Sequence, residues 1–259
     1  MEQKPLISIT TPCYNSAATI ERTIKSVLAQ KYKNYEYIIV DGGSTDGTLD
    51  IIRRYEPLFD GRMKWKSEPD KGLYDAFNKG IERSTGLYCW NVNSDDYIEP
   101  DALQILAKHI ENHPECPVIS GGMHYLTSSG ELIRDCISTP QFEEFNYKHN
   151  GMGVNHPATV VPKAVYDKYG AFDPRFKICA DMDWFNRVHK ARVPILHIND
   201  FITNFVHGGV STQSTYQKHA KERWLLLGKK YNNLIVRLYY FVRWSIRFIM
   251  KKYYRCDKF

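Results

Sequence analysis

The sequence contains six cysteines, but no two of them stand at the C-x-x-C spacing of zinc ribbons and redox centres. Their scatter matches no other metal-ligand pattern either. Cys13 and Cys89 fall in or beside expected strands, so buried free thiols are expected there in place of disulfides. The cysteines therefore indicate neither a structural metal nor a redox activity.

An apolar leader is also missing, because residues 1–5 read Met-Glu-Gln-Lys-Pro and lead directly into an expected strand. Signal peptides need an apolar run at this point, so we expect a cytoplasmic protein. Internal repeats and low-complexity segments are absent as well. The 259 residues suffice for one large α/β domain or two small ones.

The main part of the chain lacks an excess of positive charge. The net charge is +6, yet residues 218–259 carry 12 Lys/Arg against 2 Asp/Glu, and the preceding 217 residues carry 23 against 27. A nucleic-acid-binding face needs basic residues clustered on the domain itself. We therefore expect no nucleic-acid partner.

Strands and helices alternate over the first half of the chain, which is typical of an open, mostly parallel sheet flanked by helices. The expected strands are 6–11, 35–40, 63–66, 86–92 and 117–120. The expected helices are one that starts near Ser16 or Ala17 and runs through Leu28, and others at 48–55, 73–84 and 102–110. Beyond residue 121 the pattern changes. A β-hairpin is expected from 123–126 and 132–136, followed by helices near 163–169 and 182–189.

Four loops rich in polar residues and glycine follow the expected strands, at 12–16, 41–47, 68–72 and 93–97. Ligands of open α/β sheets bind beyond the carboxyl ends of the strands. We therefore expect these four loops to form one site at the same edge of the sheet.

The most informative loop reads Asn93-Ser94-Asp95-Asp96 and follows an apolar strand. Two adjacent carboxylates at such a point need a cation or several hydrogen-bond donors. A divalent metal that bridges a nucleotide diphosphate fits, since Mg²⁺ and Mn²⁺ take carboxylate and phosphate oxygens. The alternative is that Asp95 or Asp96 caps the helix that begins near residue 101.

The other loops allow similar pairs of interpretations. Tyr14 can stack on a flat nucleobase. Asp41 can accept a hydrogen bond from an N–H group of that base, or residues 41–43 can simply form a turn. Asp70 and Lys71 can contact ribose or phosphate, or they can belong to a solvated charged turn.

Taken together, these residues resemble a known family. The segments are 12–15 (PCYN), 40–47 (VDGGSTDG), 70–80 (DKGLYDAFNKG) and 93–96 (NSDD), in family order and spacing. The set is similar to inverting family 2 glycosyltransferases of the GT-A fold, of the kind that builds bacterial surface polysaccharides. The resemblance covers residues 5–210 approximately.

The resemblance implies roles for these positions. The nucleotide of a nucleoside-diphosphate sugar would be held by Pro12, Tyr14, Asn15, Asp41, Asp70 and Lys71. Asp95 would contact ribose or metal, and Asp96 would bind Mn²⁺ or Mg²⁺. Asn93 departs from the family, since many relatives have an aspartate there, so metal binding is expected to rest on Asp95 and Asp96.

A second acidic segment, 180–184, reads Ala-Asp-Met-Asp-Trp. Relatives carry Glu-Asp-x-Asp here, and the aspartate that matches Asp181 is their catalytic base. Ala180 replaces the glutamate. Asp183 is the competing candidate, and either aspartate can instead cap the helix that follows.

Two histidines are further candidates. His156 can face the acceptor or a phosphate, or it can be a hydrogen-bonded structural histidine. His207 lies in a glycine-bearing loop and best matches the late histidine that many GT-A enzymes place on the metal or the diphosphate. The alternative is an ordinary loop histidine.

The C-terminal segment has a different character. If residues 234–255 are helical, aliphatic residues gather on one face and five Lys/Arg on the other. Three arginines interrupt the apolar stretch, so a spanning helix is not expected. An amphipathic helix on an anionic membrane surface fits better, and packing on the domain or on a second subunit is the alternative.

The sequence thus predicts a GT-A-like glycosyltransferase domain over 1–215, with a nucleotide-binding half at 1–121 and an acceptor and catalytic half at 122–215, and a basic amphipathic tail at 216–259. We expect it at the inner face of the cell membrane, acting on a saccharide or lipid-linked saccharide. Two alternatives are a sugar-nucleotide pyrophosphorylase, which needs a glycine-rich basic loop absent from 12–15, and a catalytically inactive nucleotide-sugar-binding or membrane scaffold protein.

Overall fold

The computed structural model describes residues 6–115, 117–140 and 153–209, together with residues 222, 226, 238 and 242. The chain divides into two units, Met1–Gln213 and Ser214–Phe259. Apart from the four single positions, the expected amphipathic tail lies outside the described residues. Within the part that is described, no helix is both long and apolar enough to cross a bilayer.

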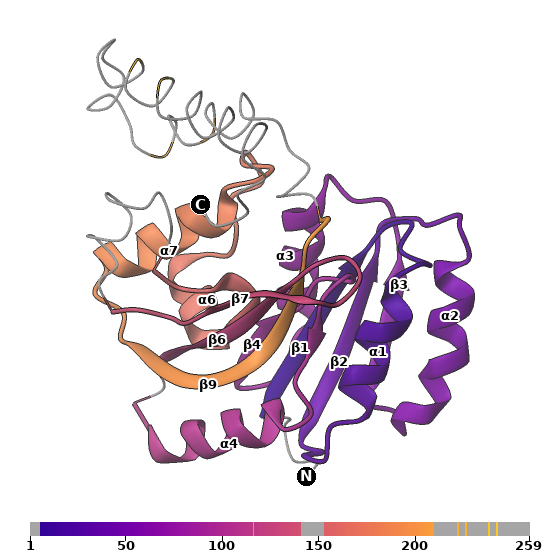
Figure 1. The fold of residues 1–259 in the computed structure, drawn as a ribbon, viewed down its shortest axis with the longest axis horizontal. Coiled ribbons are helices and arrows are strands. Elements are labelled where there is room, and N and C mark those ends of the chain that lie inside the picture. Colours follow the sequence, from indigo (N-terminus) through magenta and orange to yellow (C-terminus); the bar gives the residue numbers. More distant parts are fainter. Residues whose placement is uncertain are drawn as a thin grey trace. The chain divides into compact units, whose positions relative to one another are not determined.

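The N-terminal half of the sheet is parallel, as expected. Its strands are β1 (Ile7–Cys13), β2 (Tyr35–Asp41), β3 (Met63–Ser67) and β4 (Tyr88–Asn91), in the spatial order β3-β2-β1-β4. They alternate with α1 (Ile20–Leu28), α2 (Thr48–Tyr55) and α3 (Leu73–Arg83). Short 3-10 turn η1 (Glu56–Phe59) follows α2. Figure 1 shows these strands side by side.

Strand β2 illustrates how this half is layered. Tyr37 and Ile39 belong to the main core together with residues of α1, whereas Ile38 and Val40 pack with Ala76 of α3. Successive side chains of a strand point to opposite faces, so a strand covered on both faces must be apolar throughout. All seven residues of β2 are buried.

The C-terminal half of the sheet is mixed, and here the expectation of a mostly parallel sheet is wrong. Strands β8 (Thr159–Pro162), β6 (Val118–Leu126), β9 (Ile195–Val206) and β5 (Tyr97–Ile98) extend the order beyond β4, and β7 (Leu132–Cys136) pairs with β6. The pairs β4/β8, β8/β6, β6/β7 and β9/β5 are antiparallel, and only β6/β9 is parallel. Short turn η2 (His156–Ala158) leads straight into β8.

The segments 117–120 and 123–126, expected as two strands, form the single strand β6. Its register shifts at Gly122. A Cβ atom at Gly122 would lie 2.9 Å from the Phe201 ring. Glycine at this position allows β6 to pass close to β9. The hairpin of β6 and β7 is confirmed.

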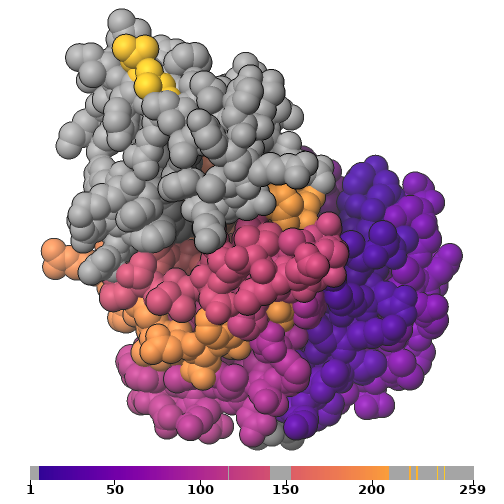
Figure 2. Space-filling view, in the orientation of Figure 1, coloured from indigo at the N-terminus to yellow at the C-terminus, as the bar shows by residue number. Residues whose placement is uncertain are grey.

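Helices α4 (Ala102–Asn112), α6 (Lys163–Tyr169) and α7 (Ala180–Lys190) complete the described elements. Figure 1 shows α4 at the base of the sheet and α6 and α7 beside the later strands. In Figure 2 the early residues, from indigo to purple, and the later strands, in pink and orange, occupy adjacent parts of one face. The active-site candidates come from both parts.

Glu36 provides a test of how this sheet is stabilised. Its side chain is buried in β2, and its Oε1 accepts hydrogen bonds from the Ser8 hydroxyl at 2.7 Å and the Thr85 hydroxyl at 2.8 Å, while Oε2 pairs with Lys64 at 3.1 Å. Burial alone raises the pKa of Glu36, but the hydrogen bonds from Ser8 and Thr85 outweigh burial, and the pKa is lowered from 4.5.

We expect Glu36→Gln to lower the free energy of unfolding at pH 7 by about 1–3 kcal/mol, because its neutral oxygen is a weaker acceptor. A carboxyl whose folded-state pKa is lowered stabilises the fold above its unfolded-state pKa, and this stabilisation is lost as the pH falls through the folded-state value. In urea unfolding, the difference between Glu36→Gln and the unchanged protein should therefore shrink below pH 4.5. Exposed Glu111→Gln is the control, and a difference that does not vary with pH would contradict an ionised Glu36.

Candidate active site

A cavity of about 790 Å³ opens where β1 and β4 end, between the two halves of the sheet. Seven of the residues predicted from the sequence line it: Pro12, Tyr14, Asn15, Asp70, Asp95, His156 and Asp181. Asp41, Lys71, Asp96 and His207 are not part of the lining. Loops 12–16, 68–72 and 93–97 thus contribute to one cavity, whereas loop 41–47 contributes no lining residue. What these residues bind stays a prediction.

The loop after β1 forms one end of the cavity. The Tyr14 ring is 64% exposed, which leaves its face open to a flat ligand. Asn15 adopts a positive φ of 48°. Its backbone N–H donates to the Ser44 hydroxyl at 2.8 Å, and its Oδ1 accepts from the Thr45 N–H at 2.9 Å. Asn15 thus fastens this loop to the loop after β2.

Asp41 lies behind the cavity wall and is fully buried. Its carboxylate accepts hydrogen bonds from the N–H groups of Gly43 and Ser44, from the Ser44 hydroxyl and from the Ser67 hydroxyl. Burial raises its pKa, but the hydrogen bonds from Ser44 and Ser67 dominate, and the pKa is lowered. In this structure the side chain organises its own loop, and its oxygens do not face the cavity.

The loop after β3 contributes a carboxylate to the cavity. Asp70 lines the cavity, and its Oδ1 accepts from the Gly72 N–H at 2.8 Å. The Lys71 side chain is exposed outside the lining. Lys177, which the sequence analysis missed, lines the cavity instead, and its Nζ donates to the Lys71 carbonyl at 2.8 Å. The basic residue at the site therefore comes from the other half of the chain.

The two adjacent carboxylates after β4 have different surroundings. Asp95 lines the cavity, whereas Asp96 is fully buried and accepts hydrogen bonds from the Val206 N–H and from Asn93 Nδ2, both at 2.9 Å. Burial raises the pKa of Asp95. Burial, together with the neighbouring Asp95 charge, raises the pKa of Asp96 to about 8.

Helix α1 holds this carboxylate loop from behind. The Arg22 guanidinium donates to the Asp95 carbonyl at 2.7 Å, and the Thr23 hydroxyl donates to the Asp96 carbonyl at 2.5 Å. The helix that follows, α4, has Asp101 as its N-cap residue. The alternative in which Asp95 or Asp96 caps that helix is therefore wrong.

The predicted metal ligands Asp95, Asp96 and His207 are not brought together. Among the described residues, no group of three or more His, Cys, Asp or Glu side chains could hold a metal ion. His207 Nδ1 is hydrogen-bonded to the Tyr125 hydroxyl at 2.6 Å. Asp96 has both oxygens occupied by the chain. Asp95 alone of the three is open to the cavity, and one carboxylate plus the oxygens of a diphosphate is an ordinary set for Mg²⁺ or Mn²⁺.

The two aspartates of α7 are clearly separated by the structure. Asp181 lies in the first turn of the helix and lines the cavity. Asp183 is not in the lining, and its Oδ2 accepts from Arg187 Nε at 2.9 Å. The N-cap residue of α7 is Cys179, so neither aspartate is the N-cap residue. Asp181 is the carboxylate of this pair that a ligand can reach.

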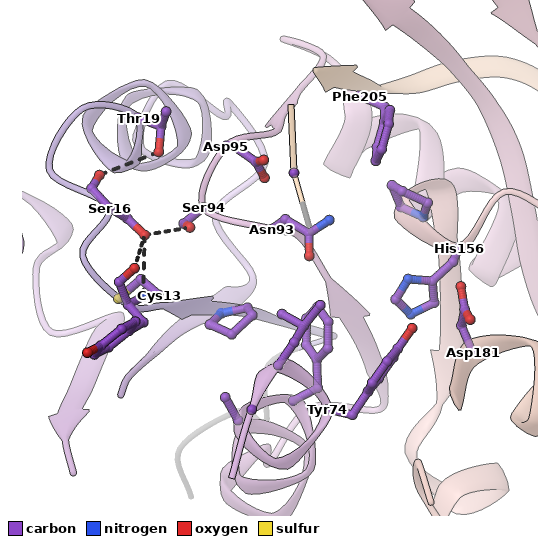
Figure 3. Close-up of a pocket in the computed structure, with 18 of the residues that line it drawn as sticks. Cys13, Ser16, Thr19, Tyr74, Asn93, Ser94, Asp95, His156, Asp181 and Phe205 are labelled. Carbon is purple, nitrogen blue, oxygen red and sulfur yellow. Dashed lines mark hydrogen bonds between the residues drawn. The ribbon is translucent and has the colours of Figure 1, made fainter. Parts of the chain in front are cut away.

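Tyr74 and His156 surround Asp181, and Figure 3 shows the three side chains gathered on one side of the cavity. The Tyr74 hydroxyl donates to the Ile178 carbonyl at 2.9 Å, and burial and then the Asp181 charge raise the Tyr74 pKa. The His156 ring meets the rings of Phe77 and Phe172 edge to face. Burial lowers the pKa of His156 and outweighs the Asp181 charge, which acts in the opposite direction. The imidazole is therefore neutral at pH 7.

Sequence reasoning missed Tyr74, Lys177 and Phe205 as lining residues. Tyr74 stands inside the matched segment 70–80, so its position held a usable signal. Lys177 and Phe205 stand in no recognised pattern, and only the fold brings them to the cavity.

The fold and this cavity define an α/β protein with a polar cavity at the ends of its strands, and comparison with known proteins gives the family. The family model described as Glycosyl transferase family 2 matches residues 8–170. The chain belongs to glycosyl transferase family 2. The family resemblance found in the sequence is thereby confirmed.

Relatives with curated names agree. The chain is 28% identical over 181 residues to the PGL/p-HBAD biosynthesis glycosyltransferase Rv2957 of Mycobacterium tuberculosis, covering 70% of this chain and 68% of the relative. It is 30% identical over 198 residues to the protein of the same organism named uncharacterized glycosyltransferase Rv1514c, covering 75% and 73%.

Solved structures support the GT-A type of fold. The chain resembles S. aureus TarS 1-349 in complex with UDP-GlcNAc, with a TM-score of 0.65 and 21% identity, covering 81% of this chain and 61% of TarS 1-349. It also resembles the mannosyltransferase PcManGT from Pyrobaculum calidifontis in complex with GDP-Man and Mn²⁺, with a TM-score of 0.59 and 18% identity, covering 85% and 60%. At these identities the likeness concerns the fold.

Proposed function

We propose that this glycosyltransferase moves a sugar from a nucleoside-diphosphate sugar to an acceptor hydroxyl, with inversion at the anomeric carbon and with help from a divalent metal. The observation that carries the proposal is the separation of two carboxylates in one cavity. Asp95 belongs to the N-terminal half and Asp181 to the first turn of α7, and Figure 3 shows them on different sides of the cavity. One carboxylate serves the leaving group, and the other serves the attacking group.

Asp181 is the proposed general base. A carboxylate that takes the proton from the acceptor hydroxyl as it attacks is a standard device of transferases. The donor's diphosphate would leave on the opposite side of the anomeric carbon, so the configuration inverts and no covalent sugar–enzyme bond is needed. Tyr74 keeps its proton because its pKa is raised, so it cannot compete with Asp181 as the base.

The negative charge of the cavity supports the proposal that a divalent metal ion takes part. Its described lining carries three carboxylates, Asp70, Asp95 and Asp181, against one lysine, Lys177. A diphosphate adds negative charge to a site that is already negative, which is unfavourable at close range. Mg²⁺ or Mn²⁺ bound at Asp95 would neutralise the charge that develops on the leaving diphosphate.

The nature of the donor is supported by the neighbours alone. TarS is described in complex with UDP-GlcNAc, and PcManGT in complex with GDP-Man and Mn²⁺. The exposed Tyr14 ring and the Pro12 ring border the end of the cavity where a base would stack. Uracil, guanine and thymine are all compatible with a flat stacking surface.

We further propose that the acceptor is a saccharide or lipid-linked saccharide and that the protein works at the inner face of the cell membrane. Residues 218–259 carry 12 Lys/Arg against 2 Asp/Glu. In the second unit, Leu238 and Val242 are helical, stand four residues apart and are 60% and 47% exposed. Two exposed aliphatic residues four positions apart, in a part of the sequence rich in Lys and Arg, support binding to an anionic lipid surface.

The test is release of nucleoside diphosphate from a panel of UDP-, GDP- and dTDP-sugars, with and without MnCl₂. We expect release from one donor and its loss when the metal is chelated. The purified protein is also mixed with vesicles of neutral or anionic lipid, and only the anionic vesicles should sediment it. Donor binding without any release would point to a strict acceptor requirement or to the inactive nucleotide-sugar-binding alternative, and absence of both would overturn the proposal.

A further inference from the structure

Three side chains form a row across neighbouring strands of the C-terminal half. The register pairs Arg134 of β7 with Tyr125 of β6, and Tyr125 with Phe205 of β9. Directly paired residues of neighbouring strands point to the same face, so the three side chains stand next to one another. Phe205 is the member of this row that lines the cavity.

Tyr125 is held from several directions. Its ring stacks with that of Phe205 at a centroid distance of 5.4 Å and an interplanar angle of 23°. The Arg134 guanidinium lies over the Tyr125 ring, 5.4 Å from its centroid. The Tyr125 hydroxyl is hydrogen-bonded to His207 Nδ1 at 2.6 Å. These contacts fix the orientation of Tyr125, and the stack in turn fixes the orientation of Phe205.

The surroundings of Phe205 are suited to one face of a ring. Phe205, Met123 and Pro157 give this part of the cavity an apolar wall, next to His156. Figure 3 shows the Phe205 ring on the same side of the cavity as His156 and Asp181. The end of the cavity where the nucleobase is proposed to stack, with Pro12 and Tyr14, is formed by the other half of the chain. An apolar wall on the side of Asp181, the proposed catalytic base, suits the acceptor. The acceptor's hydroxyl loses its proton to Asp181, and the apolar wall keeps water away from it.

We propose that Phe205 is the platform for a pyranose ring of the acceptor, and that Tyr125 and His207 are positioning residues that hold this platform. The inference rests on the proposed function. An aromatic face carries partial negative charge, and the C–H groups on one face of a pyranose carry partial positive charge. A sugar ring can therefore stack on Phe205 while its hydroxyls on the ring edge reach Asp181 and His156.

This assigns His207 a role different from the metal ligand expected from the sequence. His207 is not in the cavity lining, whereas its neighbours Gly208 and Gly209 are. Its backbone N–H donates to the Leu126 carbonyl at 2.8 Å, and the described contacts of its side chain are with Tyr125, through the hydrogen bond and an edge-on ring contact at 5.9 Å. Its effect on the reaction therefore passes through Tyr125 and Phe205.

The first experiment measures sugar binding without turnover. Saturation-transfer NMR is recorded on the full chain with diamagnetic MgCl₂, with whichever of UDP, GDP and dTDP the protein binds, and with a panel of methyl pyranosides of glucose, galactose, mannose, rhamnose and N-acetylglucosamine. We expect at least one glycoside to show transfer concentrated on the C–H groups of one ring face. Phe205→Leu keeps an apolar side chain and should weaken that glycoside about tenfold to a hundredfold, whereas Phe205→Tyr should keep its affinity.

The second experiment separates a positioning residue from a metal ligand. Tyr125→Phe removes only the hydroxyl, and His207→Ala removes its partner. Each should weaken glycoside binding about threefold to tenfold, and the double variant should be no weaker than either one, because both act through the same side chain. The affinity of the nucleoside-diphosphate complex for Mn²⁺, followed by electron paramagnetic resonance, should stay unchanged. His113→Ala, another partly exposed histidine paired with a neighbour, is the matched control.

Each contrary result has a defined meaning. Absence of binding by every glycoside, or unchanged binding in Phe205→Leu, overturns the platform. Loss of Mn²⁺ affinity in His207→Ala makes that residue a ligand and overturns its positioning role. Weaker binding of the donor in place of the glycoside in Phe205→Leu moves the platform to the donor sugar and overturns the acceptor assignment. Binding of UDP, GDP and dTDP with the metal by the unchanged protein is measured first, since absence of binding by all three is a failure of the proposed function and not of this inference.

Discussion

Asp181→Asn is expected to lower kcat for sugar transfer by about a thousandfold, because the amide cannot take the proton of the acceptor hydroxyl. Asparagine has nearly the same size as aspartate, so the cavity and α7 should remain intact. The KM for the donor should change little, since Asp181 acts on the acceptor. The measurement is the rate of nucleoside diphosphate release with the donor found in the panel.

Asp183→Asn is the matched control for this prediction. It lies two residues away on the same helix, faces Arg187 at 2.9 Å and is absent from the cavity lining. It should lose a partly exposed ion pair of about 0–1 kcal/mol and keep its turnover. If Asp183→Asn proved inactive and Asp181→Asn active, the assignment of the base would be reversed.

The second large effect is expected at Asp95. Asp95→Asn should lower kcat/KM by about a hundredfold to a thousandfold and raise the Mn²⁺ concentration needed for half-maximal rate. The reason is that Asp95 is the carboxylate of the loop after β4 that is open to the cavity. Initial rates across a MnCl₂ titration measure both quantities.

Asp96→Asn distinguishes two assignments of the metal ligand. The sequence predicted that both Asp95 and Asp96 bind the metal, whereas the structure favours Asp95 alone. Each Asp96 oxygen accepts a hydrogen bond, from Val206 N–H and from Asn93 Nδ2. An amide would face one of these donors with its own NH₂ group, so we expect a loss of about 1–3 kcal/mol in the free energy of unfolding. The Mn²⁺ dependence of the folded variant should stay normal. A greater Mn²⁺ requirement in Asp96→Asn than in Asp95→Asn would show that Asp96 is the ligand.

Much of the local structure could be predicted from the sequence. The expected helices 48–55 and 163–169 coincide with α2 and α6. Helical periodicity and strand patterns are local signals. The spacing of apolar residues in a helix alone decides which of its faces packs against the core. The direction of β8 and the continuity of β6 through Gly121 and Gly122 depend on which strand lies beside them, and no local pattern carries that information.

The candidate site shows the same division. Residues named as candidates from the sequence line the cavity: Pro12, Tyr14, Asn15, Asp70, Asp95, His156 and Asp181. The first five follow expected strand ends, and Asp181 belongs to the second acidic segment. Asp41 and Asp96 are of the expected residue type, but neighbouring donors surround their oxygens. Whether a carboxylate faces a ligand or the interior depends on donors such as Ser67 and Val206, which are distant in sequence.

The sequence by itself determined the alternation of strands and helices in the first half, the family, and the acidic residues at the strand ends. These follow from residue type and spacing along the chain. Only the tertiary structure decided which member of each pair faces the cavity: Asp95 and not Asp96, Asp181 and not Asp183, Lys177 and not Lys71. The physical reason is that a charged side chain turns toward solvent or toward whatever partners the fold supplies, and those partners come from elements far away in the chain.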